Sequence, residues 1–237
     1  MKSVMTKFVL FTNFNPKFLE NTSSKITYSQ DTHEMIVKCT GKAHAAIANS
    51  FNDEIIKQVA AMSLPLADSL LSTGDGRCRG NVISKDPDYS VRPKSQSLPP
   101  SRSTDWPSIV VEVGVSEKLP QSMKDATFWL SNSNNDVKMV IVVSIDPLVP
   151  NILFRCVMIS GTLVERNGRT KYIYATRQEM QIKRNAARAC VTTNGPLVIH
   201  FEELFLRQPM APETDITLRF AILEGVAHAI WDDYLHI

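Results

Sequence analysis

An apolar run interrupted by a single carboxylate most constrains how this chain can fold. Residues 109–115 read IVVEVGV, and the later segment VKMVIVVSI is again continuous in Val and Ile. Short runs this rich in β-branched residues are typical of strands buried on both faces of a sheet. Between them, KDATFWLSN favours a helix. Strand, helix and strand together predict a crossover unit within an α/β sheet.

The N-terminal segments predict a strand pair followed by a helix. Residues 25–39, KITYSQDTHEMIVKC, read as two short strands around a polar turn. The next segment places Ile47, Phe51, Ile55 and Val59 four residues apart, which is the spacing of an amphipathic helix.

The remaining segments predict loops, more strands and a final helix. Gly and Pro punctuate residues 74–107 so densely that we expect only short strands, around NVISK and YSVRP. Farther along, ILFRCVMISGTLVE, KYIYAT and EMQIK indicate strands, and RFAILEGVAHAIWDDYL indicates an amphipathic helix. The predicted fold is therefore mixed α/β with a partly antiparallel sheet.

Length and charge limit the domain organisation and the class of partner. With 237 residues, 43% of them hydrophobic, the chain can bury a substantial core. We expect a single domain over 1–237, with its core at about 25–150 and a C-terminal elaboration at about 151–237. The net charge of only +2 produces no global field that would mark a nucleic-acid binder, so such a role would need a local basic patch.

Cysteine usage and hydropathy suggest a soluble intracellular protein. Cys39, Cys78, Cys156 and Cys190 are widely separated and form no Cys-x-x-Cys pair, which argues against a zinc site or a disulfide framework. KFVLF is too short for a signal-peptide core, and no apolar run approaches the roughly 18 residues of a membrane span. We therefore expect a cytoplasmic or nuclear protein that does not contact the membrane.

The carboxylate of Glu112 requires a partner, because an ionised group in a two-sided apolar strand is costly to desolvate. Asp88 follows the Pro of DPD at the start of another extended segment and can supply a second carboxylate nearby. Two hard oxygen ligands suit Mg²⁺ or Mn²⁺, and the backbone carbonyl of Val113 could be a third. The alternatives are an internal salt bridge for Glu112 and a simple turn role for Asp88.

These segments carry a family resemblance. DPDYSVRP, then PSIVVEVGVSE, KDATFWL and VKMVIVVSID, resembles the PD-(D/E)XK restriction-endonuclease-like superfamily, and most closely its Uma-type and fungal Crinkler-type nuclease domains. The resemblance implies a mixed central sheet flanked by helices, with additional C-terminal strands and a helix. It also implies Mg²⁺- or Mn²⁺-dependent phosphodiester hydrolysis, as an endonuclease for which DNA is favoured over RNA. Asp88 and Glu112 would be catalytic and would bind the metal.

One position departs from the family pattern. The pattern expects Lys two residues after the Glu, and this chain has Gly114 there, on the same side of the strand as Glu112. The resemblance implies that the lysine has moved to the following helix, where Lys124 is the candidate and Lys118 the alternative. It also implies an acidic residue from the first helix that would help to bind a second metal ion, for which Glu54 is best placed.

Basic residues gather in the loop-rich region and could contact nucleic acid. Phosphate-contacting side chains favour such loops, although solvated loops also carry them. The candidates are Arg77, Arg79, Lys85, Arg92, Lys94 and Arg102, with Lys183, Arg184 and Arg188 of KRNAAR in addition. We expect weak, salt-sensitive and sequence-tolerant binding. His44 is expected to be a cap or surface residue, and Trp106 and Trp129 are expected in the core.

Two other functions stay open at this point. Gly114 is compatible with a catalytically inactive module on the same scaffold that binds nucleic acid or a protein partner. A metal-free hydrolase with Asp88 and Glu112 as acid and base is the third hypothesis. The sequence leaves the strandedness of the substrate and the oligomeric state undecided, and a dimer is among the options.

Overall fold

The computed structural model describes residues 7–15, 17, 19, 25–80, 82–115, 119–164 and 170–237. In these ranges the largest unit is a seven-stranded sheet with the order β12-β11-β10-β9-β8-β7-β4. Its strands are β4 (Leu70–Ser72), β7 (Tyr89–Pro93), β8 (Ile109–Val115), β9 (Met139–Ile145), β10 (Asn151–Val164), β11 (Thr170–Arg184) and β12 (Cys190–Thr193).

The centre of this sheet is the predicted crossover unit. β8 and β9 pair in parallel and are connected through α3 (Leu119–Asn132), whereas β7 pairs antiparallel to β8 and β10 antiparallel to β9. Every residue of β8 is buried, as expected for a strand covered on both faces. The prediction of a mixed α/β fold with a mixed central sheet is therefore confirmed.

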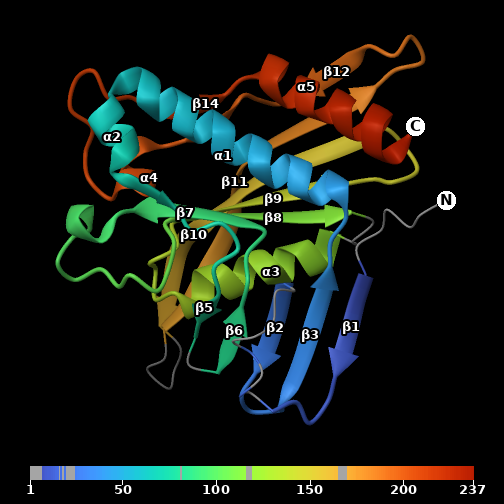
Figure 1. Cartoon of the computed structure of the whole chain (residues 1–237). Helices are drawn as coiled ribbons and strands as arrows, with labels where there is room; N and C mark the ends of the chain where they lie inside the picture. Colours follow the sequence, from blue (N-terminus) through green and yellow to red (C-terminus); the bar gives the residue numbers. More distant parts are fainter. Residues whose placement is uncertain are drawn as a thin grey trace.

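Helices cover the two faces of the central sheet, and Figure 1 shows α1 (Lys42–Met62) and α3 on opposite sides of β8. The apolar residues that recur every fourth position in α1 are all buried, and they share a core with Val111, Val113 and Val115 of β8. They are Ile47, Phe51, Ile55 and Val59. On the other face, Val110, Val140 and Val142 pack with Trp129 of α3. The alternation of side chains along β8 thus divides the interior into two cores.

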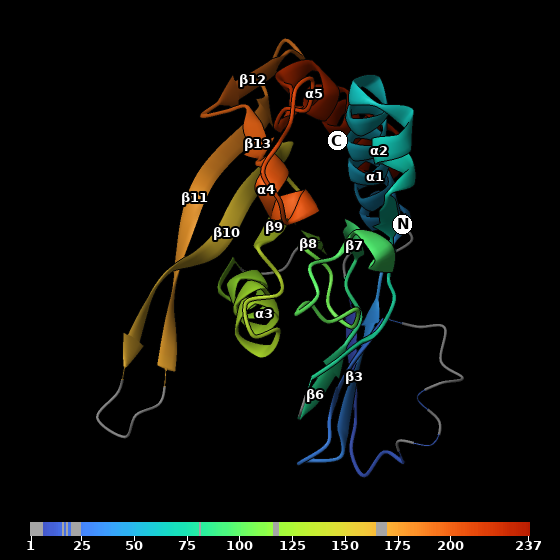
Figure 2. The same ribbon diagram turned by 90° about the vertical axis from the view of Figure 1, so that its left-hand side faces the viewer.

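Three N-terminal strands and two short strands from residues 78–85 form a second sheet, the N-terminal sheet, with the order β1-β3-β2-β6-β5. Its strands are β1 (Lys7–Phe11), β2 (Lys25–Ser29), β3 (Glu34–Cys39), β5 (Cys78–Arg79) and β6 (Ile83–Lys85). The predicted strand pair at 25–39 is the β2–β3 hairpin. Figure 2 shows this sheet extending from the central sheet on the same side as α3.

The two faces of the N-terminal sheet differ in polarity. Ile26, Tyr28 and Met35 are buried together on one face. On the other face, Lys25 of β2 lies directly opposite Lys38 of β3, and Thr27 lies opposite Lys85 of β6. Because paired residues project to the same side, the three lysines share one face of the sheet.

The C-terminal part extends the central sheet. KYIYAT and EMQIK, expected as two strands, form the single strand β11, because it pairs with β10 continuously from Thr170 to Lys183 and β-bulges absorb the changes in register. The predicted final helix is α5 (Phe220–Ala229) followed by a π-helical turn, η3 (Ile230–Leu235).

Small elements complete the described part of the chain. They are α2 (Leu64–Asp68), η2 (Ser95–Ser97), β13 (Leu197–Ile199), α4 (Phe201–Phe205) and β14 (Ile216–Leu218), and β13 pairs with β14. None of the helices described is both long enough and apolar enough to cross a bilayer.

Candidate functional site

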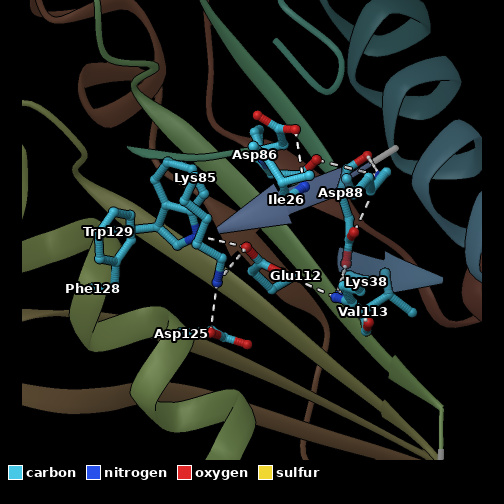
Figure 3. A network of polar contacts seen from close by, with 12 residues as sticks. Ile26, Lys38, Lys85, Asp86, Asp88, Glu112, Val113, Asp125, Phe128 and Trp129 are labelled. Carbon is cyan, nitrogen blue, oxygen red and sulfur yellow. Dashed lines mark hydrogen bonds and ion pairs between the residues drawn. The ribbon is translucent and has the colours of Figure 1, made fainter. Parts of the chain in front are cut away.

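The carboxylates of Asp88 and Glu112 meet at the junction of the two sheets. Asp88 directly precedes β7, and Glu112 lies in the middle of β8, whose residue Val111 pairs with Tyr89 of β7. Their side chains are 0% and 3% exposed, and both contact the same ammonium, that of Lys38 (Figure 3). The structure therefore brings together the two carboxylates that the sequence proposed as a pair.

Three oxygens converge on the Nζ of Lys38. This nitrogen lies 2.8 Å from Oδ2 of Asp88, 3.3 Å from Oε2 of Glu112 and 3.0 Å from the backbone oxygen of Val113. An ammonium has three N–H donors, so each of these oxygens can accept one. They are the same three groups that the sequence proposed as metal ligands.

Asp88 is held by further donors. Lys25 Nζ lies 3.1 Å from its Oδ1, His44 Nε2 lies 2.9 Å from its Oδ2, and the amide of Val113 donates to Oδ2 at 2.6 Å. Burial alone would raise the pKa of Asp88, but the charge of Lys38, with His44 and Lys25, outweighs it and holds this pKa well below its ordinary value. Asp88 is therefore held in its ionised form by two ammoniums, an imidazole and a backbone amide.

Glu112 occupies a different electrostatic environment. Trp129 Nε1 donates to its Oε1 at 2.6 Å, and Lys85 Nζ lies 3.2 Å from the same oxygen. Lys85 is shared with Asp125 of α3, whose Oδ1 lies 2.6 Å from Nζ. Burial, with the charges of Asp88 and Asp125, outweighs the two lysines and raises the pKa of Glu112. Of the two carboxylates, Glu112 is the one that takes up a proton more easily.

The lysines that lie beside the two carboxylates belong to other elements than the helix that the sequence favoured. Lys124 is exposed on α3, and no ion pair or side-chain hydrogen bond involves it among the described residues. Lys118 lies outside the described residues. The ammoniums beside Glu112 belong instead to Lys38 and Lys85, because the N-terminal sheet presents its lysine face to β8.

Glu54 is likewise placed away from the two carboxylates. Its Oε1 accepts a hydrogen bond from Gln58, which also bonds the backbone of Thr217 in β14. The α1 residue that reaches Asp88 is His44, which is ten positions and therefore about 15 Å earlier along the helix. Rather than acting as a cap or surface residue, His44 is buried against the site.

Most of the basic residues proposed to bind nucleic acid have partners within the chain. Arg77 makes two hydrogen bonds to Asp86, and Arg102 pairs with Asp136 and donates to backbone carbonyls. Arg92 is buried and donates to the carbonyl of Pro93, and Lys85 belongs to the carboxylate network. In the second group, Arg184 and Arg188 pair with Asp232, and Lys183 is exposed.

Arg79 is exposed and Lys94 is half-buried. Because Lys85 and Arg92 are buried, the loop region of the described chain does not present the whole proposed set on its surface. Nucleic-acid contacts by these residues stay a prediction. Trp106 and Trp129 are buried as expected, and Trp129 also donates to Glu112.

Sequence reasoning missed the residues that complete the network, namely Lys25, Lys38, His44, Asp125 and Trp129 as a hydrogen-bond donor. A signal for two of them was present, because folding 25–39 as a hairpin about its polar turn places Lys25 opposite Lys38. Two like charges directly across a strand pair are unfavourable unless an anion lies between them. Asp88, which contacts both, is that anion.

A cavity of about 360 Å³ adjoins the network. Its walls come from the lysine face of the N-terminal sheet, the start of α3 and exposed apolar side chains; they include Phe8, Lys25, Ile36, Lys38, Gln121 and Asp125. The site therefore has room beside it, although the carboxylates themselves are buried.

The donor set fits a hard divalent ion. Two carboxylate oxygens and one carbonyl oxygen converge on a single point, and such ions are commonly held by one or two carboxylates with water completing the shell. Within the described ranges, no group of three or more His, Cys, Asp or Glu side chains could hold a metal. A divalent ion would thus depend on these three oxygens, whose common point is taken by Lys38.

Comparisons with known proteins give distant structural similarity and no match to a protein-family model or a curated protein. Among solved structures, the chain is similar to a protein from Anabaena variabilis described as a "putative nuclease belonging to DUF820", with 17% identity and a TM-score of 0.41. The similarity covers 69% of this chain and 84% of the other. At this TM-score the similarity carries no argument about function.

Proposed function

We propose that the protein is a phosphodiester hydrolase dependent on Mg²⁺ or Mn²⁺, acting as an endonuclease on DNA rather than RNA. The observation that carries this proposal is the position of Lys38 Nζ, within hydrogen-bond reach of Asp88 and Glu112. The PD-(D/E)XK pattern expects a lysine on β8 at the position of Gly114, and Lys38 would supply the ammonium in its place. Two carboxylates, a carbonyl and a lysine are thus assembled from three separate segments.

Each residue of the network has a role that follows from its contacts. Oxygens of Asp88, Glu112 and Val113 would hold the ion, which when bound supplies an acidified water and neutralises charge on the phosphate. His44 and Lys25 fix the orientation of Asp88, in the way that second-shell donors fix metal ligands generally.

The ammoniums of Lys38 and Lys85 would stabilise negative charge on a bound phosphate. Lys38 and Lys85 keep positive charge next to Glu112, where a phosphate bound at the site would develop negative charge. A compact ammonium on a flexible stem suits this task, and such preorganised charge is a large contributor to catalysis. Trp129, which donates to the other side of Glu112, keeps that carboxylate directed toward the lysines.

A second candidate function is a catalytically inactive module that binds nucleic acid or a protein. The observation in its favour is that the carboxylate of Asp88 is fully buried and already contacts the ammoniums of Lys25 and Lys38, the imidazole of His44 and the Val113 amide. A network so complete is self-sufficient as an internal ion cluster.

A cleavage assay separates the two functions. Single- and double-stranded DNA and RNA are incubated with the protein and Mg²⁺ or Mn²⁺, with chelator as the blank. We expect metal-dependent cleavage of DNA, its loss in Glu112→Gln, and a rate lowered on the order of a hundredfold in Lys38→Met. Retained nucleic-acid binding without cleavage of any substrate would establish the inactive module instead.

A further inference from the structure

The cation at the centre of the site is part of the protein itself. Oδ2 of Asp88, Oε2 of Glu112 and the carbonyl of Val113 surround Lys38 Nζ at 2.8 to 3.3 Å, and the Lys38 side chain is 10% exposed. Within the described part of the chain, the three oxygens that accept from this ammonium are the oxygens that a hard divalent ion would use.

An ammonium and a divalent ion cannot share this position. Both would need the same oxygens, and two cations a few ångströms apart in a buried site repel strongly. Lys25 does not compete with an ion for these three oxygens. Its partners among the described residues are Oδ1 of Asp88 and the backbone oxygens of Pro87 and Asp88.

The surroundings give the Lys38 ammonium a place to go. The cavity of about 360 Å³ is lined by Lys38 itself and by the polar side chains of Gln121, Asp86 and Asp125. A lysine stem has four rotatable carbons, so its head can move into this space without movement of β3. Acceptors in the cavity wall would compensate for the oxygens that it leaves.

We infer that Lys38 is a displaceable counter-ion: its ammonium closes the oxygen site of Asp88, Glu112 and Val113, and a divalent ion enters only when Lys38 swings into the adjoining cavity. This inference rests on the proposed function for the identity of the metal ligands, but it does not require catalysis. Lys38 would then control metal uptake and afterwards stand beside the bound phosphate.

The first test measures Mn²⁺ binding by calorimetry at neutral pH for wild type, Lys38→Met and Lys25→Met. Methionine keeps much of the stem and removes the charge. Lys25→Met is the matched control, because it removes a charge from Asp88 without opening the three-oxygen site. We expect Lys38→Met to bind Mn²⁺ more tightly than wild type by on the order of tenfold or more, and Lys25→Met to gain much less.

An equal gain in the two variants would mean that only net charge matters, and no gain in a folded Lys38→Met protein would mean that these oxygens do not take the ion. Either result overturns the inference.

The second test uses wild-type protein, so it does not depend on how the variants fold. Lysine labelling with an amine-reactive reagent is read by mass spectrometry with and without saturating Mn²⁺. We expect Lys38 to be protected without metal and to become several-fold more reactive with it, whereas Lys25 should change little. Unchanged protection of Lys38 in protein that binds Mn²⁺ would reject the exchange.

These readouts are independent of the cleavage assay. Exchange of Lys38 for Mn²⁺ without cleavage would support the inference and refute the proposed nuclease. Metal-dependent cleavage with Lys38 still protected from labelling would support the proposed nuclease and refute the inference.

Discussion

The two faces of β8 bury opposite kinds of group within one strand. Toward α1 the strand presents Val111, Val113 and Val115 to an apolar core. Toward α3 it presents Val110 to a second apolar core and Glu112 to lysines and an indole N–H. Apolar burial stabilises in proportion to the area removed from water and tolerates partial loss. A buried ion network adds little net stability, but it becomes costly when one partner is removed. The apolar face therefore stabilises the fold, and the charged face restricts which residues can change.

The largest effect should come from Asp88→Asn. The substitution leaves Lys25, Lys38 and His44 around a neutral amide, and breaking a buried pair in this way typically costs about 3–5 kcal/mol of unfolding free energy. Urea unfolding at pH 7 measures it. A loss below about 1 kcal/mol would show that the cluster rearranges freely.

The difference in unfolding free energy between wild type and Asp88→Asn should depend on pH. Since the pKa of Asp88 is lowered in the folded protein, its stabilisation is fully present above its unfolded value near 4 and is lost as the pH falls through the folded pKa. The difference between wild type and Asp88→Asn should therefore be constant from pH 5 upward and shrink only below about pH 4.

A substitution on the apolar face gives the second-largest effect. Val111→Ala removes two buried methyl groups from the core toward α1, which should cost roughly 2 kcal/mol of unfolding free energy through lost burial and a small cavity. This loss should be the same at pH 4 and pH 7, because no charge is involved. A pH-dependent loss would indicate that the two faces of β8 are coupled.

Glu112→Gln should change stability less than either. Burial and the neighbouring Asp88 and Asp125 raise the pKa of Glu112, so its ionised form is a net cost in the folded protein above that pKa. An amide of the same shape removes this cost and keeps Oε1 for Trp129, but it places an N–H₂ group in place of the Oε2 that accepts from Lys38. Because the two effects oppose each other, we expect a change within about 1 kcal/mol at pH 7.

The sign of the pH dependence for Glu112 is opposite to that for Asp88. Wild type should gain stability relative to Glu112→Gln as the pH falls from the raised folded pKa to the unfolded value near 4.3. Parallel pH profiles for Asp88→Asn and Glu112→Gln would show that the two carboxylates share one environment.

How much of this could be predicted from sequence depends on the range of the interaction. β8, β9, α3 and the two carboxylates were predictable, because buried strands have a composition of their own and a charge in such a strand needs a partner. The identity of that partner could not be predicted, because Lys38 lies 50 residues from Asp88 and 74 residues from Glu112 along the chain. Which face of the N-terminal sheet meets β8 is decided by packing, and no local pattern reports it.

The smallest expected effect belongs to Lys124→Ala, which tests that limit directly. The family pattern places the relocated lysine on the helix after β8, yet Lys124 is exposed there while Lys38 and Lys85 contact Glu112. Removing an exposed side chain without an ion pair should change unfolding free energy by less than about 0.5 kcal/mol. Metal affinity and cleavage rate should also stay at the wild-type level, measured beside Lys38→Met. A hundredfold slower Lys124→Ala enzyme with unchanged stability would mean that α3 turns this lysine inward when substrate binds, and that Lys38 is only a counter-ion.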